Sequence, residues 1–294
     1  MKKTLNIRPA DKGDRAAVEA ISAQIWDGDD YVSEVWDEWL ADPHGQFAVA
    51  EMEGRVVAFA KLTRFAEDEW WMEGMRVDPA YRQRGIGSQL HHYLLEEARR
   101  MGRGTVRLGT AADNDGVHRM AQGERFHHIA TYERFKALVA PMDVASPLLR
   151  FDEPDLPAVW ALVQESARYR ASRGMYELWW HWKNLTYSRF RDHLAAGEVW
   201  GIESAGHVTA LSIICQEEEA DLLHVCYVDG TDAALPTLAR GLRGLAGRLG
   251  CSAGVRFKAI SEPTLIGAIE DAGYERAGED LWIFERRLDE GESE

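Results

Sequence analysis

The sequence predicts an α/β protein with mixed sheets, built from two tandem copies of one fold. Strand-like and helix-like stretches alternate along all 294 residues. Their order in the first half recurs from residue 148 onward, with a period of roughly 145 residues, which is too long for a solenoid repeat. Each copy contains a strand–turn–helix–strand unit, and such a unit places two parallel strands in one sheet.

The first half begins with a strand and a pair of helices. An apolar strand at 5–8 precedes the first helix, and a second helix at 31–40 carries its apolar residues at helical spacing. Residues 46–62 contain two strand-like runs around a glycine turn, which predicts a hairpin. A strand at 70–77 leads through a turn with two glycines to a helix that ends at Gly102, and "TVRLGT" predicts the next strand.

The second half repeats this order. The stretch "LLRFDEPDLPAVWALV" echoes "LNIRPADKGDRAAVEAI", and "EVWGIESAGHVTALSII" predicts a second hairpin. The stretch "CYVDGTDAALPTLARGLRGLAG" matches "MRVDPAYRQRGIGSQLHHYLLEE". The boundary between the copies falls near 140–147. We therefore expect domains at 1–140 and 147–288, followed by a disordered tail at 289–294.

The composition argues against several classes of protein. The net charge of −15 disfavours unspecific nucleic-acid binding, because such binding depends on a basic surface. No apolar run reaches the roughly 18 residues of a membrane span, and the two lysines at the start precede no apolar block of a signal peptide. The three cysteines and ten histidines show neither C-x-x-C nor H-E-x-x-H spacing. We expect a cytoplasmic protein that binds no metal, membrane or nucleic acid.

The turn in "RVDPAYRQRGIGSQL", residues 76–90, has the features of an anion site. The first amides of a helix lack partners inside it, and the helix dipole attracts negative charge there. Gly85 and Gly87 allow close approach of a phosphate, and Arg82 and Arg84 add positive charge. The stretch matches neither a P-loop nor G-x-G-x-x-G. The alternative is a glycine turn with solvated arginines.

The stretch "VDPAYRQRGIG" resembles the acetyl-CoA loop of the GNAT superfamily of N-acetyltransferases, whose pattern is Gln/Arg-x-x-Gly-x-Gly/Ala after a V-x-P strand end. Arg82, Gly85 and Gly87 take the three motif positions. The order of elements around the motif also matches, so the resemblance covers nearly the whole chain as two tandem GNAT-like domains. It implies acetyl-CoA as co-substrate and a small-molecule amine as acceptor. We expect a monomer or a homodimer.

The resemblance also implies where the cofactor binds. In the family, the strand before the loop binds pantetheine through its main chain, here Met75, Arg76 and Val77. An asparagine after the next strand often meets the CoA arm, and Asn114 fits that position. The loop and helix start bind the pyrophosphate, here Arg82, Gln83, Arg84, Gly85, Ile86, Gly87 and Ser88.

The second half departs from this pattern at the corresponding turn. It reads "GTDAALP", without the arginines and glycines of the motif. Asp232 adds negative charge and Pro236 removes an amide donor. We therefore expect a degenerate second domain and one cofactor per chain.

Acetyl transfer needs a neutral amine, and a lysine-like amine has a pKa near 10.4, so a general base is useful. In many family members a strand glutamate serves, and the candidates are Glu73, in an apolar setting, and Glu69. The alternative for Glu73 is a solvated carboxylate at the edge. Ala121 stands where the family places a tyrosine acid, which leaves Tyr132 as a weaker candidate.

The acceptor is less constrained than the cofactor. Acids and aromatics alternate near the first helix pair, which suits a small cationic amine through charge and cation–π contact. The alternative is that the tryptophans are core and the acids face water. This set comprises Asp27, Asp29, Asp30, Glu34, Asp37 and Glu38, with Trp26, Tyr31, Trp36 and Trp39.

Other functions remain open at this level. A protein that keeps the loop but lacks an acid could be a non-catalytic acyl-CoA-binding sensor. The aromatic stretch "YELWWHWKNLTY", residues 176–187, could pack between the domains, close over a substrate groove, or serve a structural or partner-binding tandem module.

Overall fold

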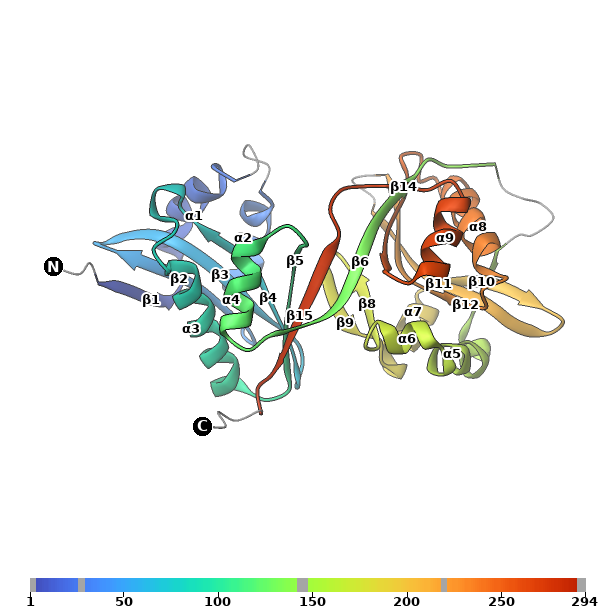
Figure 1. Cartoon of the computed structure of the whole chain (residues 1–294), viewed down its shortest axis with the longest axis horizontal. Coiled ribbons are helices and arrows are strands. Elements are labelled where there is room, and N and C mark those ends of the chain that lie inside the picture. Colours follow the sequence, from blue (N-terminus) through green and yellow to red (C-terminus); the bar gives the residue numbers. More distant parts are fainter. Residues whose placement is uncertain (1–3, 26–29, 142–147, 218–220, 290–294) are drawn as a thin grey trace. The chain divides into compact units, whose positions relative to one another are not determined.

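The computed structural model describes residues 4–25, 30–141, 148–217 and 221–289. The chain forms two compact units (Figure 1). The first unit comprises Met1–Gly109, Asn114–His128 and Phe284–Glu294, and the second comprises Thr110–Asp113 and Ile129–Ile283. The α/β class with mixed sheets is confirmed.

The first unit contains a sheet with the strand order β1-β2-β3-β4-β5. Neighbouring strands are antiparallel except β4 and β5, which are parallel. Aromatic and aliphatic side chains from α1, α2, β2 and β3 form its core. Its elements are β1 (Leu5–Pro9), α1 (Arg15–Ser22), α2 (Val32–Ala41), β2 (Gln46–Met52), β3 (Arg55–Ala66), β4 (Glu69–Val77), α3 (Ile86–Met101), β5 (Thr105–Ala111) and α4 (Asp115–Gly123).

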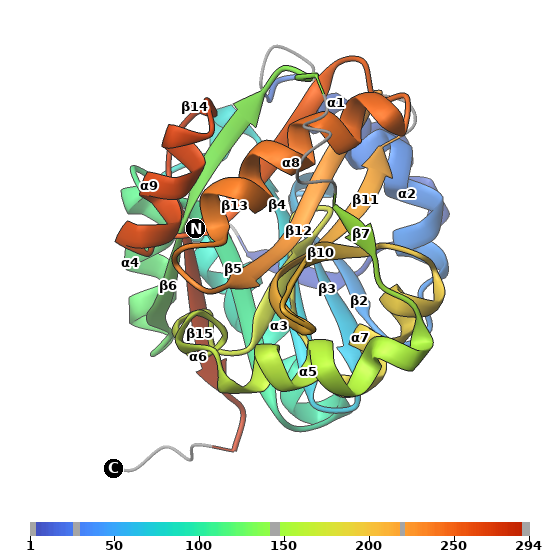
Figure 2. The same ribbon diagram turned by 90° about the vertical axis from the view of Figure 1, so that its right-hand side faces the viewer.

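The second unit repeats this plan with the strand order β6-β13-β12-β11-β10-β7, and β12 and β13 form its parallel pair. One core lies between the sheet and α8 and α9, and another involves α5 and α7 (Figure 2). Its elements are β6 (His127–Ala137), β7 (Leu149–Arg150), α5 (Leu156–Glu165), α6 (Ala167–Ala171), β8 (Met175–Leu178), β9 (His181–Asn184), α7 (Tyr187–Ala195), β10 (Val199–Ser204), β11 (His207–Glu217), β12 (Leu222–Gly230), α8 (Leu235–Arg248), β13 (Gly254–Ile260), α9 (Pro263–Asp271) and β14 (Glu275–Arg276).

The two halves of the chain exchange their last strands. Most of β6 belongs to the second unit, where it pairs with β13. The end of the chain returns to the first unit as β15 (Leu281–Arg287), beside β5. There Glu285 binds the Arg107 guanidinium at 2.7 Å, and the Leu288 amide donates to the Gly104 carbonyl at 2.8 Å.

The exchange corrects the expected boundary. Cutting the chain at 140–147 assigns β6 to the first domain and the last strand to the second, whereas the compact units have the opposite assignment. The order of elements is the same for exchanged and unexchanged strands, so the repeat in the sequence could not distinguish them. Residues 142–147 and 290–294, which cover most of the expected boundary and tail, lie outside the described residues.

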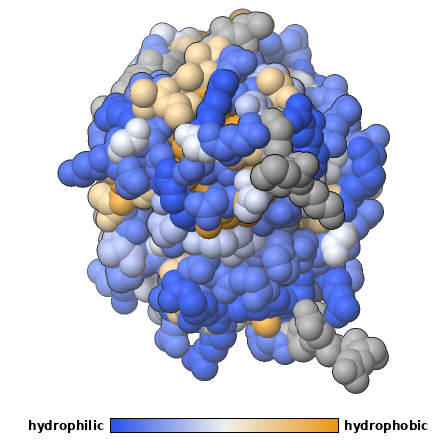
Figure 3. Space-filling model, turned by 90° about the vertical axis from the view of Figure 1, so that its left-hand side faces the viewer, coloured by the Kyte–Doolittle hydropathy of each residue, from blue (hydrophilic) through white to orange (hydrophobic). Residues whose placement is uncertain are grey.

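The stretch at 176–187 forms the hairpin β8–β9 and the start of α7, and all of it belongs to the second unit. On the N-terminal side of the chain the surface is largely hydrophilic (Figure 3). Within the described ranges, no helix combines the length and apolar character of a membrane span. Those ranges also contain no cluster of three histidine, cysteine or acidic residues that could hold a metal ion.

Candidate active site

The parallel strands β4 and β5 are paired only at their beginnings. Trp71 and Arg107 form the last registered pair, and Met72–Val77 continues along β3 instead. The two strands therefore separate toward their carboxyl ends. In an open α/β sheet, ligands bind beyond the carboxyl ends of parallel strands.

A bulge in β4 lies at this opening. Arg76 is registered with Phe59 and Glu73 with Lys61, so two residues, Gly74 and Met75, oppose one residue of β3. Such a bulge interrupts the ladder and re-aims the strand. Gly74 has a φ of 63°, and a Cβ there would lie 2.2 Å from the Trp39 ring, so only glycine fits.

The turn after β4 is built by Asp78. Its amide donates to the Val57 carbonyl at 2.9 Å, and its carboxylate accepts from the Ala80 amide at 2.9 Å, which caps a 3-10 turn at Pro79–Tyr81. Proline at the first position suits such a turn start, because no amide donor is needed there. The Val-Asp-Pro sequence thus fixes the direction in which the loop leaves the sheet.

The start of α3 has the features of an anion-binding site. Gly85 precedes it in the left-handed region, with a φ of 74° and no side-chain cap. Among the residues that the structure describes, the amides of Ile86, Gly87 and Ser88 have no hydrogen-bond partner. A Cβ on Gly85 would have no heavy atom within 4 Å, whereas a Cβ on Gly87 would be in ordinary contact with Met75 Sδ at 3.5 Å. These features fit a phosphate group.

The arginines of the loop are exposed. Arg82 donates from Nε to the Val77 carbonyl at 3.3 Å, and Arg84 donates from Nη2 to the Ala80 carbonyl at 2.9 Å. Each guanidinium is thus bonded to a nearby backbone carbonyl, and each keeps further N–H donors for a ligand. Gln83 stands between them with a φ of 62°, which makes the loop turn sharply.

Glu73 lies on β4 one residue before the bulge and is half-buried. Its carboxylate accepts a hydrogen bond of 2.5 Å from the Thr63 hydroxyl. Lys61, its cross-strand neighbour, is buried and bonded to Asp42 at 2.5 Å. Burial lowers the pKa of Lys61, while Asp42 and, more weakly, Glu73 favour its charged form. Glu73 is therefore held in place next to the opening between β4 and β5.

Glu69 is less suited to act as a base. It is buried at the closed end of the β4–β5 pair, opposite Thr105, and bonded to Arg107 at 3.3 Å. Arg107 in turn binds Glu285. Of the two candidate bases, only Glu73 lies beyond the point where β4 and β5 separate.

The described residues of the acidic and aromatic stretch differ in burial and in their partners. Trp36 and Trp39 belong to the core of the first unit, as the alternative reading held. Asp30 is buried and forms two bonds of 3.0 Å to the Arg76 guanidinium, which also lies over the Tyr31 ring. Glu34, Asp37 and Glu38 are exposed on α2. Trp26, Asp27 and Asp29 lie outside the described residues.

Asn114 and Tyr132, two further candidate site residues, have contacts that the sequence did not predict. Asn114 caps α4, accepting from the Val117 amide at 3.3 Å, so its side chain is engaged in the helix start. Tyr132 lies in the second unit, because β6 is exchanged; it is buried against Trp182 at 5.3 Å between ring centroids. The structure therefore assigns Glu73 and Tyr132 to different units. Ala121 is buried in α4 and offers no acid.

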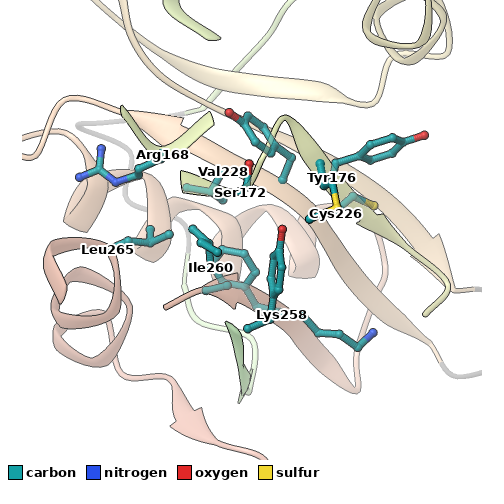
Figure 4. A pocket seen from close by; sticks show the side chains of 13 residues that line it. Arg168, Ser172, Tyr176, Cys226, Val228, Lys258, Ile260 and Leu265 are labelled. Atoms are coloured by element: carbon teal, nitrogen blue, oxygen red, sulfur yellow. The ribbon is translucent and has the colours of Figure 1, made fainter. Parts of the chain in front are cut away.

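The corresponding opening in the second unit is filled. Strands β12 and β13 also separate after their last registered pair, Val225 and Phe257. Side chains from several elements occupy the gap and leave a cavity of about 20 Å³, room for roughly one water molecule (Figure 4). The lining includes Tyr132, Arg168, Tyr176, Tyr227, Ile260 and Leu265.

Arg168 closes the turn beyond this gap. Its guanidinium donates to Asp232 at 2.5 Å, to Glu262 at 3.0 Å and to the Gly230 carbonyl at 2.7 Å. The amide of Leu235, at the start of α8, is bonded to the Thr231 carbonyl at 3.2 Å. The guanidinium of Arg168 and the amide of Leu235 are therefore already bonded to groups of the protein. They are not available to an anion, and side chains fill the space that it would need.

The fold of the first unit places an unpartnered helix start, within the described residues, beyond the point where two parallel strands separate. The acetyltransferase (GNAT) family model matches residues 16–126. The N-alpha-acetyltransferase RimI of Mycobacterium tuberculosis is 30% identical over 128 residues, which are 42% of this chain and 79% of that protein. The chain belongs to the GNAT acetyltransferase family.

Solved structures extend the likeness in fold to the whole chain. A GCN5-related N-acetyltransferase from Sphaerobacter thermophilus has a TM-score of 0.69 at 15% identity, covering 98% of this chain and 96% of that one. A tandem GNAT protein from the clavulanic acid biosynthesis pathway has a TM-score of 0.60 at 16% identity, covering 98% and 100%. The predicted tandem GNAT-like fold is confirmed.

Several residues of the site escaped the sequence analysis. The bulge had a signal, since an isolated glycine within a strand pattern indicates one, and Gly74 is such a residue. The pair Asp30–Arg76 had no such signal in the sequence. Nothing local specifies which of several acidic residues binds an arginine 46 residues away. The same holds for Arg168 and its three partners.

Proposed function

We propose that this protein transfers an acetyl group from acetyl-CoA to the amine of a small, cationic acceptor, and that it binds one acetyl-CoA per chain, in the first unit. The observation that carries the proposal is the start of α3. Unpartnered amides, a left-handed glycine and two exposed arginines lie together where β4 and β5 separate. Family membership supports the acetyl-CoA-dependent reaction.

The residues of the site have distinct roles in the proposal. The amides of Ile86, Gly87 and Ser88, with Arg82 and Arg84, hold the pyrophosphate. The remaining loop residues, Gln83 and Gly85, shape the turn. The main chain of Met75, Arg76 and Val77 borders the pantetheine, and Asn114 borders the CoA arm.

Glu73 accepts the proton of the incoming amine, directly or through a water, because its carboxylate is fixed by Thr63 beside the opening. The exposed acids of α2, Glu34, Asp37 and Glu38, support a cationic acceptor, since they raise the local concentration of positive ligands. Acetyl-CoA supplies the acetyl group on a thiolate, a fair leaving group, so no acid from Tyr132 is needed.

The test is acetyl-CoA binding by calorimetry, followed by release of the CoA thiol with a panel of amines. Diamines, amino sugars and amino-acid amides represent small cationic acceptors. Short peptides with a free N-terminus form a second arm, since the RimI relative is an N-alpha-acetyltransferase. Turnover with the first arm is the expected result, and no acetyl-CoA binding at millimolar concentration would refute the proposal. Binding without turnover on either arm would favour the sensor.

A further inference from the structure

A second, basic groove lies in the second unit, on strands that the proposed reaction does not use. The groove has a volume of about 820 Å³, within the usual range of ligand pockets. Strands β6 and β13 form its floor. Its charged lining consists of Arg134, Lys136, Arg243, Arg256, Lys258 and Glu275. Five cations and one acid thus line one groove of a protein whose net charge is −15.

Two pairs of like charges face each other across the floor of this groove. In the register of β6 with β13, Arg134 is opposite Lys258 and Lys136 is opposite Arg256. Residues that are directly opposite share a face, and like charges in such positions destabilise a sheet. Burial lowers the pKa of Arg134, and the positive charge of Arg256 lowers it further.

The acids nearby compensate only part of this charge. Lys258 is buried and bonded to Glu177 at 2.8 Å, and Arg256 approaches Glu217 at 3.5 Å. Glu275 is registered with Lys136. Within the described ranges, Arg134, Lys136 and Arg243 have no ion-pair partner, so three cations in the groove remain uncompensated.

A strained turn places an aromatic ring at one end of the groove. Trp179 and Trp180 connect β8 to β9 as a two-residue turn, with φ values of 53° and 66°. Such turns favour asparagine and glycine, because other residues are disfavoured in the left-handed region. Trp180 is 46% exposed, with Lys258 at 4.2 Å and Arg134 at 5.1 Å from its ring centroid. Strain of this kind is often retained at functional sites.

We propose that this groove binds a small phosphate-bearing anion through Arg134, Lys136 and Arg256, with the Trp180 ring forming its end wall. Guanidinium groups pair with phosphate through two parallel hydrogen bonds, and a multiply charged ligand would relieve both like-charge pairs at once. All residues of this groove belong to the second unit, whereas the turn proposed to bind acetyl-CoA belongs to the first.

The test uses full-length protein carrying Gly87→Glu, which removes the proposed anion site of the first unit. Calorimetry at low ionic strength with inorganic pyrophosphate, ADP and citrate compares this background with Arg134→Ala plus Lys136→Ala. We expect pyrophosphate and ADP to bind, and their Kd to rise at least 10-fold in the double variant. Arg240→Ala, an exposed arginine of α8 outside the groove, should change nothing. Tighter binding of ADP than of pyrophosphate would indicate that its ring contacts Trp180.

A second variant separates binding from folding. Trp180→Gly removes the end wall and relieves the left-handed strain, so the Tm should not fall while binding weakens. Absence of binding by pyrophosphate and ADP at millimolar concentration would overturn the proposal, as would binding that the double variant leaves unchanged. Citrate binding as tight as pyrophosphate would overturn the assignment to phosphate.

Discussion

The two openings between parallel strands differ in what occupies the helix start beyond them. In the first unit, three amides of α3 are unpartnered within the described part of the chain, and a Cβ on Gly85 would have no heavy atom within 4 Å. In the second, Pro236 removes one amide of α8, Thr231 accepts another, and Arg168 draws Asp232 and Glu262 over the gap. The same arrangement of strands and helix can therefore leave the helix start open to a ligand or close it with protein side chains. A few residues of the turn decide which.

The largest expected effect is on acetyl-CoA binding in the first unit. Gly87→Glu should abolish it, because a carboxylate would stand where the pyrophosphate binds. Gly87→Ala should fold normally, since its Cβ meets only ordinary contacts at 3.5 Å and beyond. Pro236→Glu, at the second residue of α8, is the matched control and should leave binding intact. Calorimetry on all three variants makes the comparison, and binding that survives Gly87→Glu would place the cofactor elsewhere.

The next effect concerns catalysis at the same opening. Glu73→Gln should lower kcat by about 10²–10⁴-fold, the usual contribution of a general base, and flatten the rise of kcat with pH. The amide oxygen can still accept from Thr63, so acetyl-CoA affinity should stay nearly constant. Glu69→Gln is the control, with the rate expected to keep its pH dependence. An unchanged pH profile in Glu73→Gln would remove this residue from the mechanism.

In the second unit, Arg168→Ala should lower the free energy of unfolding and leave acetyl transfer unchanged. Arg168 is buried, but Asp232 is exposed and Glu262 is half-buried, so the loss of these charge-assisted bonds should cost about 1.5–3 kcal/mol. Urea unfolding of the second unit should show this loss, while acetyl-CoA stoichiometry stays at one. A second acetyl-CoA bound by the variant would show that Arg168 alone blocks the site, contrary to the role given to Pro236.

Acid should destabilise the second unit through a buried cluster. Burial alone would raise the pKa of Glu177, but His224 and Lys258 outweigh it and lower that pKa from 4.5 to about 2. Because the folded pKa lies below the unfolded one, this stabilisation is complete above pH 4.5 and is lost as the pH falls toward 2. It amounts to roughly 3 kcal/mol. The free energy of unfolding of Glu177→Gln should vary less with pH over that range, and an identical slope would contradict the cluster's role.

The smallest effect is expected for one exposed arginine of the loop. Arg82→Ala should weaken acetyl-CoA binding about 10-fold, the equivalent of roughly 1.4 kcal/mol, since one charge-assisted contact is lost in a solvated position. The loss should shrink at high salt. Arg240→Ala on α8 is the control in the second unit. An equal loss for both variants would indicate a general charge effect instead of contact with the ligand.

The sequence was sufficient to predict the fold class and the glycine turn before α3, because both depend on local patterns. Periodicity specified the strands and helices, and the spacing of Arg82, Gly85 and Gly87 specified the turn. The sequence did not predict the features that depend on contacts between residues far apart in the chain. The exchange of β6 and β15 preserves element order, and the position of Tyr132 followed from that exchange. The partners of Asp30 and Arg168 depend on residues far away in the chain.

The most direct test of the difference between the two openings is the stoichiometry of acetyl-CoA binding to the intact chain. Calorimetry should give one acetyl-CoA per chain for the unmodified protein and none for Gly87→Glu. Two sites of similar affinity, or one site that survives Gly87→Glu, would contradict the proposal that only the first unit binds acetyl-CoA.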